Sequence, residues 1–294
     1  MHSQNKAFSL IELSIVILII GILVVGVTQS SRLVSQMKLA TARQLTTSSP
    51  VASIKNLNLW LEPTLEKSFD VSEASDDSFV TNWFDINPQT SNKIVATQSN
   101  QSFKPKYYTN EINGLPALRF DGNSDWMTLG VILGLESNSK ITVFVVNKFA
   151  TNTQNFILAK QDNQVDGKGW NLVFWNGNFE LGILGNQSTN AIRASTILSN
   201  KSTYLVAASY NGNLSSAGMN IWINGEKINP TRTSTLNLTP SPNGSEDFRI
   251  GAREDNSFGW FHGSIGEIII FNDSLTDSDI IEVNNYLKKK WTIK

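Results

Sequence analysis

The chain has 294 residues, of which 40% are hydrophobic and 17% charged, so it can build one large domain or two ordinary ones. The formal net charge is -1 at pH 7. No overall basic field therefore exists to hold phosphate backbones, and we expect no nucleic acid as a partner. The absence of cysteine excludes disulfides, thiolate metal sites and cysteine nucleophiles.

The N-terminal segment from Phe8 to Val27 is apolar apart from one carboxylate, Glu12. A helix of this length would span a hydrocarbon core of roughly 30 Å. A carboxylate inside such a helix costs a few kcal/mol, on the order of 2 to 3, unless it is neutralised or paired. An ordinary membrane anchor, a cleaved secretory signal and a buried core helix are the competing interpretations. An anchor has no use for Glu12, and a secretory signal usually carries more basic residues ahead of its apolar run.

The stretch FSLIELSIVILIIGIL, which follows a short polar leader and a small residue, resembles the N-terminus of type IV prepilins and pseudopilins. The resemblance implies that a prepilin peptidase cuts after Ala7, where the family usually has Gly, and methylates Phe8. It also implies that Glu12 meets the amino terminus of a neighbouring subunit in the filament. Such pairing would relieve the cost of burying the carboxylate and select one register of assembly.

The apolar face of this helix would supply most of the adhesion between subunits through Leu10, Leu13, Ile17, Ile20 and Val24. The helical pattern continues to about residue 46, and Ser48, Ser49 and Pro50 then interrupt it. The expected divisions are a cleaved leader over 1–7, a transmembrane and stalk helix over 8–46, a linker over 47–56 and a globular domain over 57–294.

From Leu57 onward, short alternating or β-branched runs are separated by Asn, Gly, Ser and Asp, which is typical of antiparallel β structure. Asn176-Gly177 and Asn224-Gly225 predict two tight hairpins. The number and spacing of the runs favour a two-sheet sandwich or jelly roll. The chain closes with a predicted helix over TDSDIIEVNNYLKKKW, capped by Thr276.

In their order, these segments resemble a laminin G-like or concanavalin A-like jelly roll. LNLWLEP is similar to the opening strand, GLPALRFDGNSDWMTLG to the Asp-Gly turn, GMNIWINGEKI to the central hairpin and FHGSIGEIIIFNDSLTDSDIIEVNNYLKKKW to the closing strand and helix. Glucanases on this scaffold use a Glu-x-Asp-x-x-Glu strand. The chain has no Glu-x-Asp, and after cleavage it would keep one histidine, His262. We therefore expect a protein that is not an enzyme.

The residue types suggest two kinds of ligand site, one for calcium and one for a sugar. Asp121, Asn123 and Asp125 are candidate calcium ligands, although the same residues are typical of a plain turn, and we expect no other cofactor. Sugar rings stack on exposed aromatic faces, and three tryptophans near predicted loops are the candidates for such contact: Trp126, Trp170 and Trp260. Three other large rings lie within strands and are expected in the core: Trp60, Phe144 and Trp222.

Together these features predict a non-catalytic pilin-like filament subunit, a minor or tip pilin, whose jelly roll adheres to a glycan or a surface protein. It would span the inner membrane once with a periplasmic head, and then join a cell-surface pilus or a periplasmic pseudopilus. Its partners would be the prepilin peptidase and other pilin or pseudopilin subunits. The alternatives are a pseudopilin of type II secretion and a membrane-tethered carbohydrate-binding or hydrolytic protein.

Overall fold

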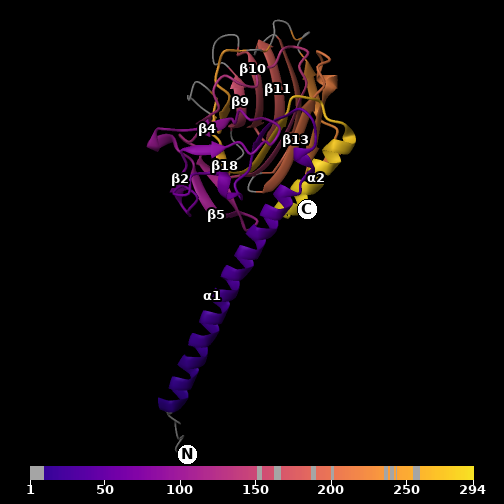
Figure 1. The fold of residues 1–294 in the computed structure, drawn as a ribbon. Helices are drawn as coiled ribbons and strands as arrows, with labels where there is room; N and C mark the ends of the chain where they lie inside the picture. Colours follow the sequence, from indigo (N-terminus) through magenta and orange to yellow (C-terminus); the bar gives the residue numbers. More distant parts are fainter. Residues whose placement is uncertain are drawn as a thin grey trace, which may run out of the picture.

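The protein consists of a long N-terminal helix and an antiparallel β sandwich that ends in a second helix (Figure 1). This confirms the predicted sandwich and closing helix. Ala7 and Phe8 lie outside the described residues, as does the side chain of Glu12. The computed structural model describes residues 10–150, 154–161, 167–186, 190–199, 202–234, 238, 242, 244–253 and 259–294.

The β sandwich and its closing helix together are called the head. Helix α1 (Leu10–Thr47) projects away from the head over most of its length (Figure 1). Its sequence contains no proline, and Pro50 follows its end, where a helix would lose its hydrogen bonding. In the part of the chain whose side chains are described, no helix offers an apolar stretch long enough to cross a membrane. Many apolar side chains of α1 are nevertheless exposed, among them Leu10, Leu13, Ile17, Ile20 and Val24.

The segment that follows α1 is packed onto the head, in contrast to the linker expected over 47–56. It forms a short 3-10 turn, η1 (Pro50–Ala52), and Val51 and Ile54 are buried. Ala42 in the last turns of α1 is buried in the same apolar cluster. Ser48, Ser49 and Pro50 mark the end of the helix as expected, but Val51 and Ile54 after them anchor the segment because burying them removes apolar surface from water.

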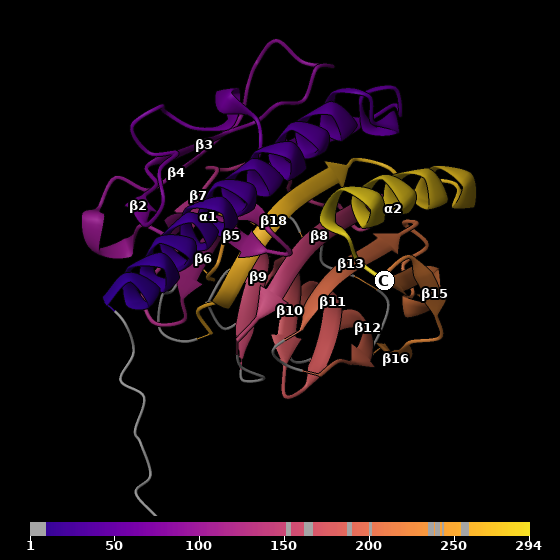
Figure 2. The same ribbon diagram turned by 90° about the horizontal axis from the view of Figure 1, so that it is seen from below.

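The first sheet carries both helices on its outer face (Figure 2). All its neighbouring strands are antiparallel, and β1 (Leu57–Leu61) pairs with β18 from outside the main order. The remaining strands, in spatial order, are β15 (Glu226–Ile228), β14 (Met219–Ile223), β13 (Thr203–Tyr210), β8 (Ile141–Phe149), β18 (His262–Phe271), β6 (Leu115–Asp121), β5 (Lys106–Ile112) and β2 (Ser78–Phe79).

The second sheet is also antiparallel and packs against the inner face of the first. Its strands, in spatial order, are β16 (Thr231–Ser234), β12 (Asn190–Ile197), β11 (Asn178–Asn186), β10 (Gly169–Trp175), β9 (Asn155–Gln161), β17 (Arg249–Ile250), β7 (Met127–Thr128), β4 (Val95–Thr97) and β3 (Asn82–Phe84). Three further 3-10 turns connect strands, namely η2 (Glu66–Ser68), η3 (Gln101–Phe103) and η4 (Ser216–Gly218).

The period of two along each strand divides the buried residues between two cores. In β8, Val143 and Val145 point into the core between the sheets, whereas Phe144 and Val146 point into a second core beneath the two helices. The predicted burial of Trp60, Phe144 and Trp222 is confirmed. The central strand is therefore apolar on both faces, which explains the unbroken hydrophobic run in its sequence.

The predicted local signals lie where the sequence placed them. Asn176-Gly177 and Asn224-Gly225 both have positive φ at both positions, as a two-residue type I′ hairpin turn requires. Helix α2 (Asp277–Trp291) begins after Thr276, whose hydroxyl accepts a hydrogen bond from the Asp279 backbone N–H.

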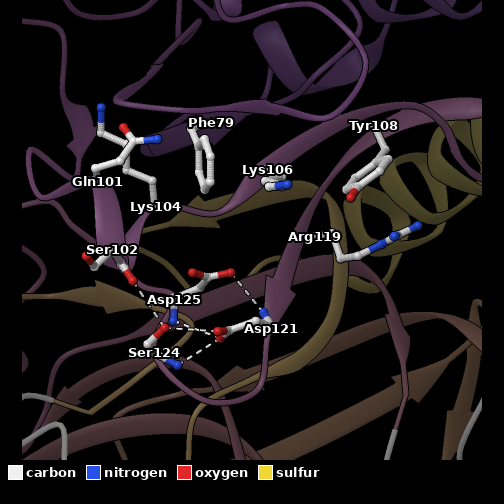
Figure 3. Close-up of a pocket in the computed structure, with 10 residues that line it drawn as sticks. All are labelled: Phe79, Gln101, Ser102, Lys104, Lys106, Tyr108, Arg119, Asp121, Ser124 and Asp125. Atoms are coloured by element: carbon white, nitrogen blue, oxygen red, sulfur yellow. Dashed lines mark hydrogen bonds between the residues drawn. The ribbon is translucent and has the colours of Figure 1, made fainter.

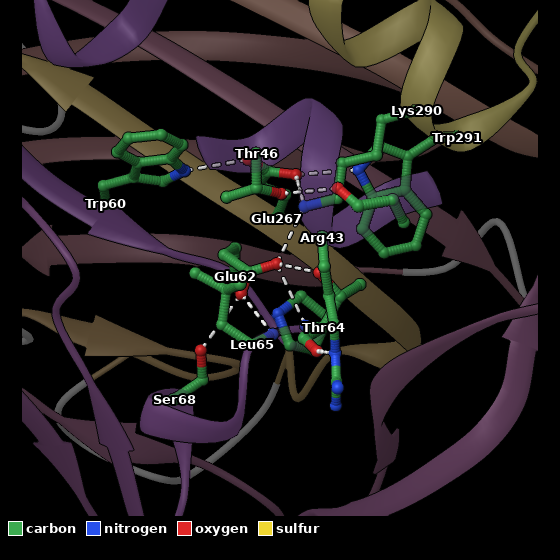
Figure 4. A network of polar contacts seen from close by, with 12 residues as sticks. Arg43, Thr46, Trp60, Glu62, Thr64, Leu65, Ser68, Glu267, Lys290 and Trp291 are labelled. Carbon is green, nitrogen blue, oxygen red and sulfur yellow. Dashed lines mark hydrogen bonds and ion pairs between the residues drawn. The ribbon is translucent and has the colours of Figure 1, made fainter. Parts of the chain in front are cut away.

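Beneath α2, a buried ion cluster joins the helix to the sheet (Figure 4). The Lys290 ammonium lies 2.7 Å from Glu62 Oε2 and 2.9 Å from Glu267 Oε2. Burial opposes the charged form of Lys290, but the two carboxylates outweigh it and raise its pKa. Burial alone would raise the pKa of Glu62, but the charge of Lys290 and hydrogen bonds from Lys290 and Thr64 outweigh it, so this pKa is lowered.

The same cluster reaches the last turn of α1. Glu267 accepts hydrogen bonds from the indoles of Trp60 and Trp291, each at 2.8 Å, and from the Tyr286 hydroxyl at 2.7 Å. The Tyr286 hydroxyl also lies 3.3 Å from the hydroxyl of Thr46 in α1. Through this cluster, polar contacts connect α1 to β1, β18 and α2.

Candidate functional site

A hollow of about 310 Å³ opens on the outer face of the first sheet, near its β2 edge (Figure 3). We call it the β2–β6 pocket. Strands β2, β5 and β6, turn η3 and the loop after β6 supply its lining. The residues that line it are Phe79, Gln101, Ser102, Lys104, Lys106, Tyr108, Arg119, Asp121, Ser124 and Asp125.

The pocket has two aromatic side chains, each in contact with a cation. Phe79 is 40% exposed, and the Lys106 ammonium lies 4.8 Å from its ring centroid. The Arg119 guanidinium lies 3.8 Å from the ring centroid of Tyr108. Lys106 and Tyr108 share one face of β5 because side chains alternate along a strand, and the residue between them, Tyr107, points into the core.

The cations of the pocket are held by polar neighbours. Lys106 pairs with Asp77 at 2.9 Å, and this contact raises the pKa of Lys106. Arg119 forms a salt bridge with Glu111 on β5. Lys104 donates a hydrogen bond to the Thr81 hydroxyl at 2.8 Å. These contacts hold the long side chains in place, which lowers the entropy that a ligand would have to remove.

The loop after β6 forms the opposite wall of the pocket. Asp121 Oδ1 accepts hydrogen bonds from the backbone N–H groups of Asn123, Ser124 and Asp125 at 2.8 to 3.0 Å. Burial alone would raise the pKa of Asp121, but these donors outweigh it and the pKa is lowered. For Asp125, burial and the charge of Asp121 raise the pKa to about 7.

A second hollow, of about 370 Å³, lies on the outer face of the other sheet, over β9 to β12. Phe156 and Trp175 contact each other edge to face, and Arg193 Nε lies 3.2 Å from Glu180 Oε1. Burial raises the pKa of Glu180 although Arg193 opposes the shift. Among the described residues that line this hollow, Glu180 is the one carboxylate, whereas glycoside hydrolysis ordinarily uses two.

Comparison with sequence families matches residues 121–281, more than half of the chain, to the concanavalin A-like lectin/glucanases superfamily. The chain belongs to this superfamily. Residues 2–28 match the prokaryotic N-terminal methylation motif. Both matches confirm the resemblances that the sequence predicted. A search of curated proteins found no related sequence.

Solved structures share the fold of this concanavalin A-like head at low identity. The binding domain of Paraclostridial Mosquitocidal Protein 1 has a TM-score of 0.54 and 13% identity over 78% of this chain and 52% of that one. A Trypanosoma rangeli sialidase in complex with sialic acid has a TM-score of 0.51 and 13% identity over 81% of this chain and 34% of that one. The chain thus spans about half or less of the length of these proteins, and the likeness concerns the fold.

The three tryptophans expected near loops have different surroundings in the concanavalin A-like head. Trp170 is fully buried, and its indole donates to the Leu133 carbonyl, so the expectation of ligand contact was wrong for this residue. Trp126 is half-buried, with the Arg249 guanidinium 4.1 Å from its ring centroid. Trp260 is half-buried next to residues 254–258, which lie outside the described part of the chain. None of the ten residues lining the β2–β6 pocket is a tryptophan.

The candidate calcium ligands Asp121, Asn123 and Asp125 lie in one loop, and both carboxylate oxygens of Asp121 are engaged by the loop itself. Asp121 Oδ2 accepts from the Ser124 hydroxyl at 2.9 Å, and Asp125 Oδ2 accepts from the Asp121 N–H at 2.9 Å. Within the described residues, no three His, Cys, Asp or Glu side chains are grouped as metal ligands. The hydrogen bonds from the backbone N–H groups of Asn123 and Ser124 to Asp121 are those of an Asx turn, and calcium binding by this loop stays a prediction.

Sequence reasoning named only Asp121 and Asp125 among the pocket residues, and it missed both aromatic ones, Phe79 and Tyr108. The alternation in KYYTNEI could have indicated that Lys106 and Tyr108 share an outward face of a strand. No comparable local signal exists for Phe79, because β2 has only two residues and reaches the pocket through its pairing with β5.

Proposed function

We propose that this chain is a non-catalytic, pilin-like filament subunit that displays its concanavalin A-like head for adhesion, as a minor or tip subunit. The proposal rests mainly on the methylation motif at residues 2–28. This motif overlaps the first half of α1, a helix with many exposed apolar side chains. In water such a surface is costly, and burial against equivalent helices or in a membrane would remove it.

The attachment of the helix to the head supports the same proposal. The last turn of α1 is fixed by Arg43, whose Nε donates to the Thr64 carbonyl at 2.7 Å and whose guanidinium pairs with Glu66 at 2.9 Å. Together with the contacts around Thr46, this holds the head at a defined position on the helix. A filament of such helices would present every head in one orientation.

Binding is the activity we propose for the head, because its outer faces carry aromatic hollows. Two proteins of similar fold are named as a binding domain and as a sialidase in complex with sialic acid. We propose a non-catalytic role because the described lining of the second hollow contains one acid, Glu180, and because both carboxylate oxygens of Asp121 in the β2–β6 pocket are engaged by hydrogen bonds of its own loop. The proposed location is the inner membrane before assembly and a filament afterwards.

The proposal is tested by replacing Glu12 in a cell that assembles type IV filaments. In the filament, the carboxylate would be buried and paired with the amino terminus of a neighbouring subunit, whereas a single subunit in the membrane has no such partner to lose. Glu12→Ala should therefore leave the amount of membrane-bound protein unchanged and lower the amount in sheared filaments at least about tenfold, because breaking a buried pair costs more than 1.4 kcal/mol.

The matched control is Ser14→Ala on the same helix. The Ser14 hydroxyl donates to the Ile11 carbonyl of its own helix, so its removal should not affect assembly. Wild-type amounts of Glu12→Ala in sheared filaments would overturn the proposed role. Equal losses for Glu12→Ala and Ser14→Ala would also count against it, because the effect would then not depend on the carboxylate.

A further inference from the structure

We propose that the β2–β6 pocket binds one unit of a neutral, hydroxyl-rich oligosaccharide, stacked on Phe79. This inference rests on the proposed binding function and assigns it a site and a class of ligand. The site differs from the aromatic hollow on the second sheet, and it involves none of the tryptophans that the sequence suggested.

Phe79 provides the apolar surface for stacking. It is a large hydrophobic side chain that remains 40% exposed in a head whose other phenylalanines are mostly buried. Figure 3 shows its ring projecting between Lys104 and Lys106, across the pocket from Asp121 and Asp125. The flat C–H face of a pyranose matches such a ring, and the hollow of about 310 Å³ is of the size of small-ligand pockets.

The polar groups around Phe79 include both donors and acceptors of hydrogen bonds. Lys104 and Gln101 can donate, and Asp125 can accept through the carboxyl oxygen that the Asp121 N–H does not engage. A sugar hydroxyl both donates and accepts, so neighbouring hydroxyls on one ring could use both kinds of group. Convergence of a few such groups around an apolar surface is the usual form of a specific small-ligand site.

The charges argue for a neutral sugar rather than an acidic one. The three cations Lys104, Lys106 and Arg119 line the pocket, but two of them are already paired, with Asp77 and with Glu111. Asp121, whose pKa is lowered by the hydrogen bonds of its loop, adds a further negative charge to the lining. An anionic sugar would have to compete with carboxylates that are already in place, and it would meet further negative charge across the pocket.

The position of the pocket leaves it free of the stalk. None of the ten lining residues belongs to α1, and the pocket lies toward the β2 edge of the sheet. Binding there would not compete with the assembly of the helices. Sugar binding and filament assembly can therefore be measured separately.

The test is titration calorimetry of the full-length protein in detergent with three neutral probes, cellotetraose, maltotetraose and chitotetraose, and one acidic probe, sialyllactose. We expect at least one neutral probe to bind, and Phe79→Ala to weaken its affinity about tenfold or more, the scale of a lost stacking contact of about 1.4 kcal/mol. Phe79→Tyr should bind as wild type does, because it keeps the ring. This second variant shows whether a loss of binding comes from the loss of the ring or from misfolding.

Trp175→Ala is the matched control, because it removes an aromatic ring from the hollow on the second sheet. It should leave the affinity unchanged. The inference is overturned if the neutral probes do not bind, if sialyllactose alone binds, or if Trp175→Ala weakens binding and Phe79→Ala does not. If the variants enter sheared filaments normally, such a result would overturn only the sugar site, and the proposed filament role would be unaffected.

Discussion

The ammonium of Lys290 lies 2.7 Å from a carboxylate oxygen of Glu62, and neither side chain has exposed surface. Lys290 belongs to α2, and Glu62 directly follows β1, so the contact joins the two ends of the head. Through Glu267 and Tyr286 the same cluster reaches Thr46 in the stalk. The charges are therefore placed where the stalk, the first strand and the closing helix meet.

Replacing Lys290 with Met should lower the free energy of unfolding by about 3 to 5 kcal/mol, because Glu62 and Glu267 would stay buried without their counter-ion. Urea unfolding monitored by circular dichroism measures this change in the free energy of unfolding. The control is Lys140→Met, which removes an exposed pair with Asp273 at 3.8 Å and should change stability by less than about 1 kcal/mol. Equal effects of the two substitutions would contradict the role of the buried cluster.

Asp125 should make the head less stable as the pH rises from about 4 to about 7. Burial and the charge of Asp121 raise its pKa to about 7 in the folded protein, above the ordinary value of 3.8. Within this window the folded state holds a proton that the unfolded state has lost. The free energy of unfolding therefore falls with rising pH, by at most about 1.4 kcal/mol per pH unit, and the fall ends above the folded pKa.

Asp125→Asn removes this titration, so the difference in stability between variant and wild type should change with pH only inside that window. The comparison cancels the contributions of other titrating groups, because these are present in both proteins. Unfolding in urea at several pH values from 4 to about 8 provides the measurement. A constant difference across the range would show that Asp125 titrates normally.

Trp170→Phe should destabilise the head by about 1 to 3 kcal/mol without affecting sugar binding. The substitution keeps most of the buried ring but leaves the Leu133 carbonyl without its indole donor, which lies at 2.8 Å. Leu133 has a positive φ, an uncommon conformation for leucine. In the wild-type protein the indole hydrogen bond helps to hold this strained turn, and the variant lacks it. Thermal unfolding and calorimetry with the oligosaccharides separate the two effects. A loss of sugar affinity in a folded variant would contradict the purely structural role.

Local features of the fold could be predicted because their signals are contained in a few neighbouring residues. The Asn-Gly pairs specify tight hairpins through positive φ, and Thr276 caps α2 through the backbone three residues on. The end of α1 was predictable from Pro50 for the same reason. Packing of the segment after α1 was not, because the burial of Val51 depends on the helix and sheet that surround it.

The site was less predictable because it is assembled from distant parts of the chain. Phe79 reaches the pocket through the pairing of β2 with β5, and nothing near it in the sequence indicates this. Proximity to a loop was a poor guide for Trp170, which is covered by the facing sheet. The ion pair between Glu62 and Lys290 spans 228 positions, and no spacing rule relates two residues so far apart.

The N-terminal residue of the mature protein shows whether the chain is processed as a pilin. Mass spectrometry of protein extracted from membranes, with and without an active prepilin peptidase, identifies it. Pilin-type processing predicts a peptidase-dependent start at methylated Phe8. An intact Met1, or cleavage near Ser30 that does not depend on the peptidase, would contradict it and leave an anchored or secreted binding domain.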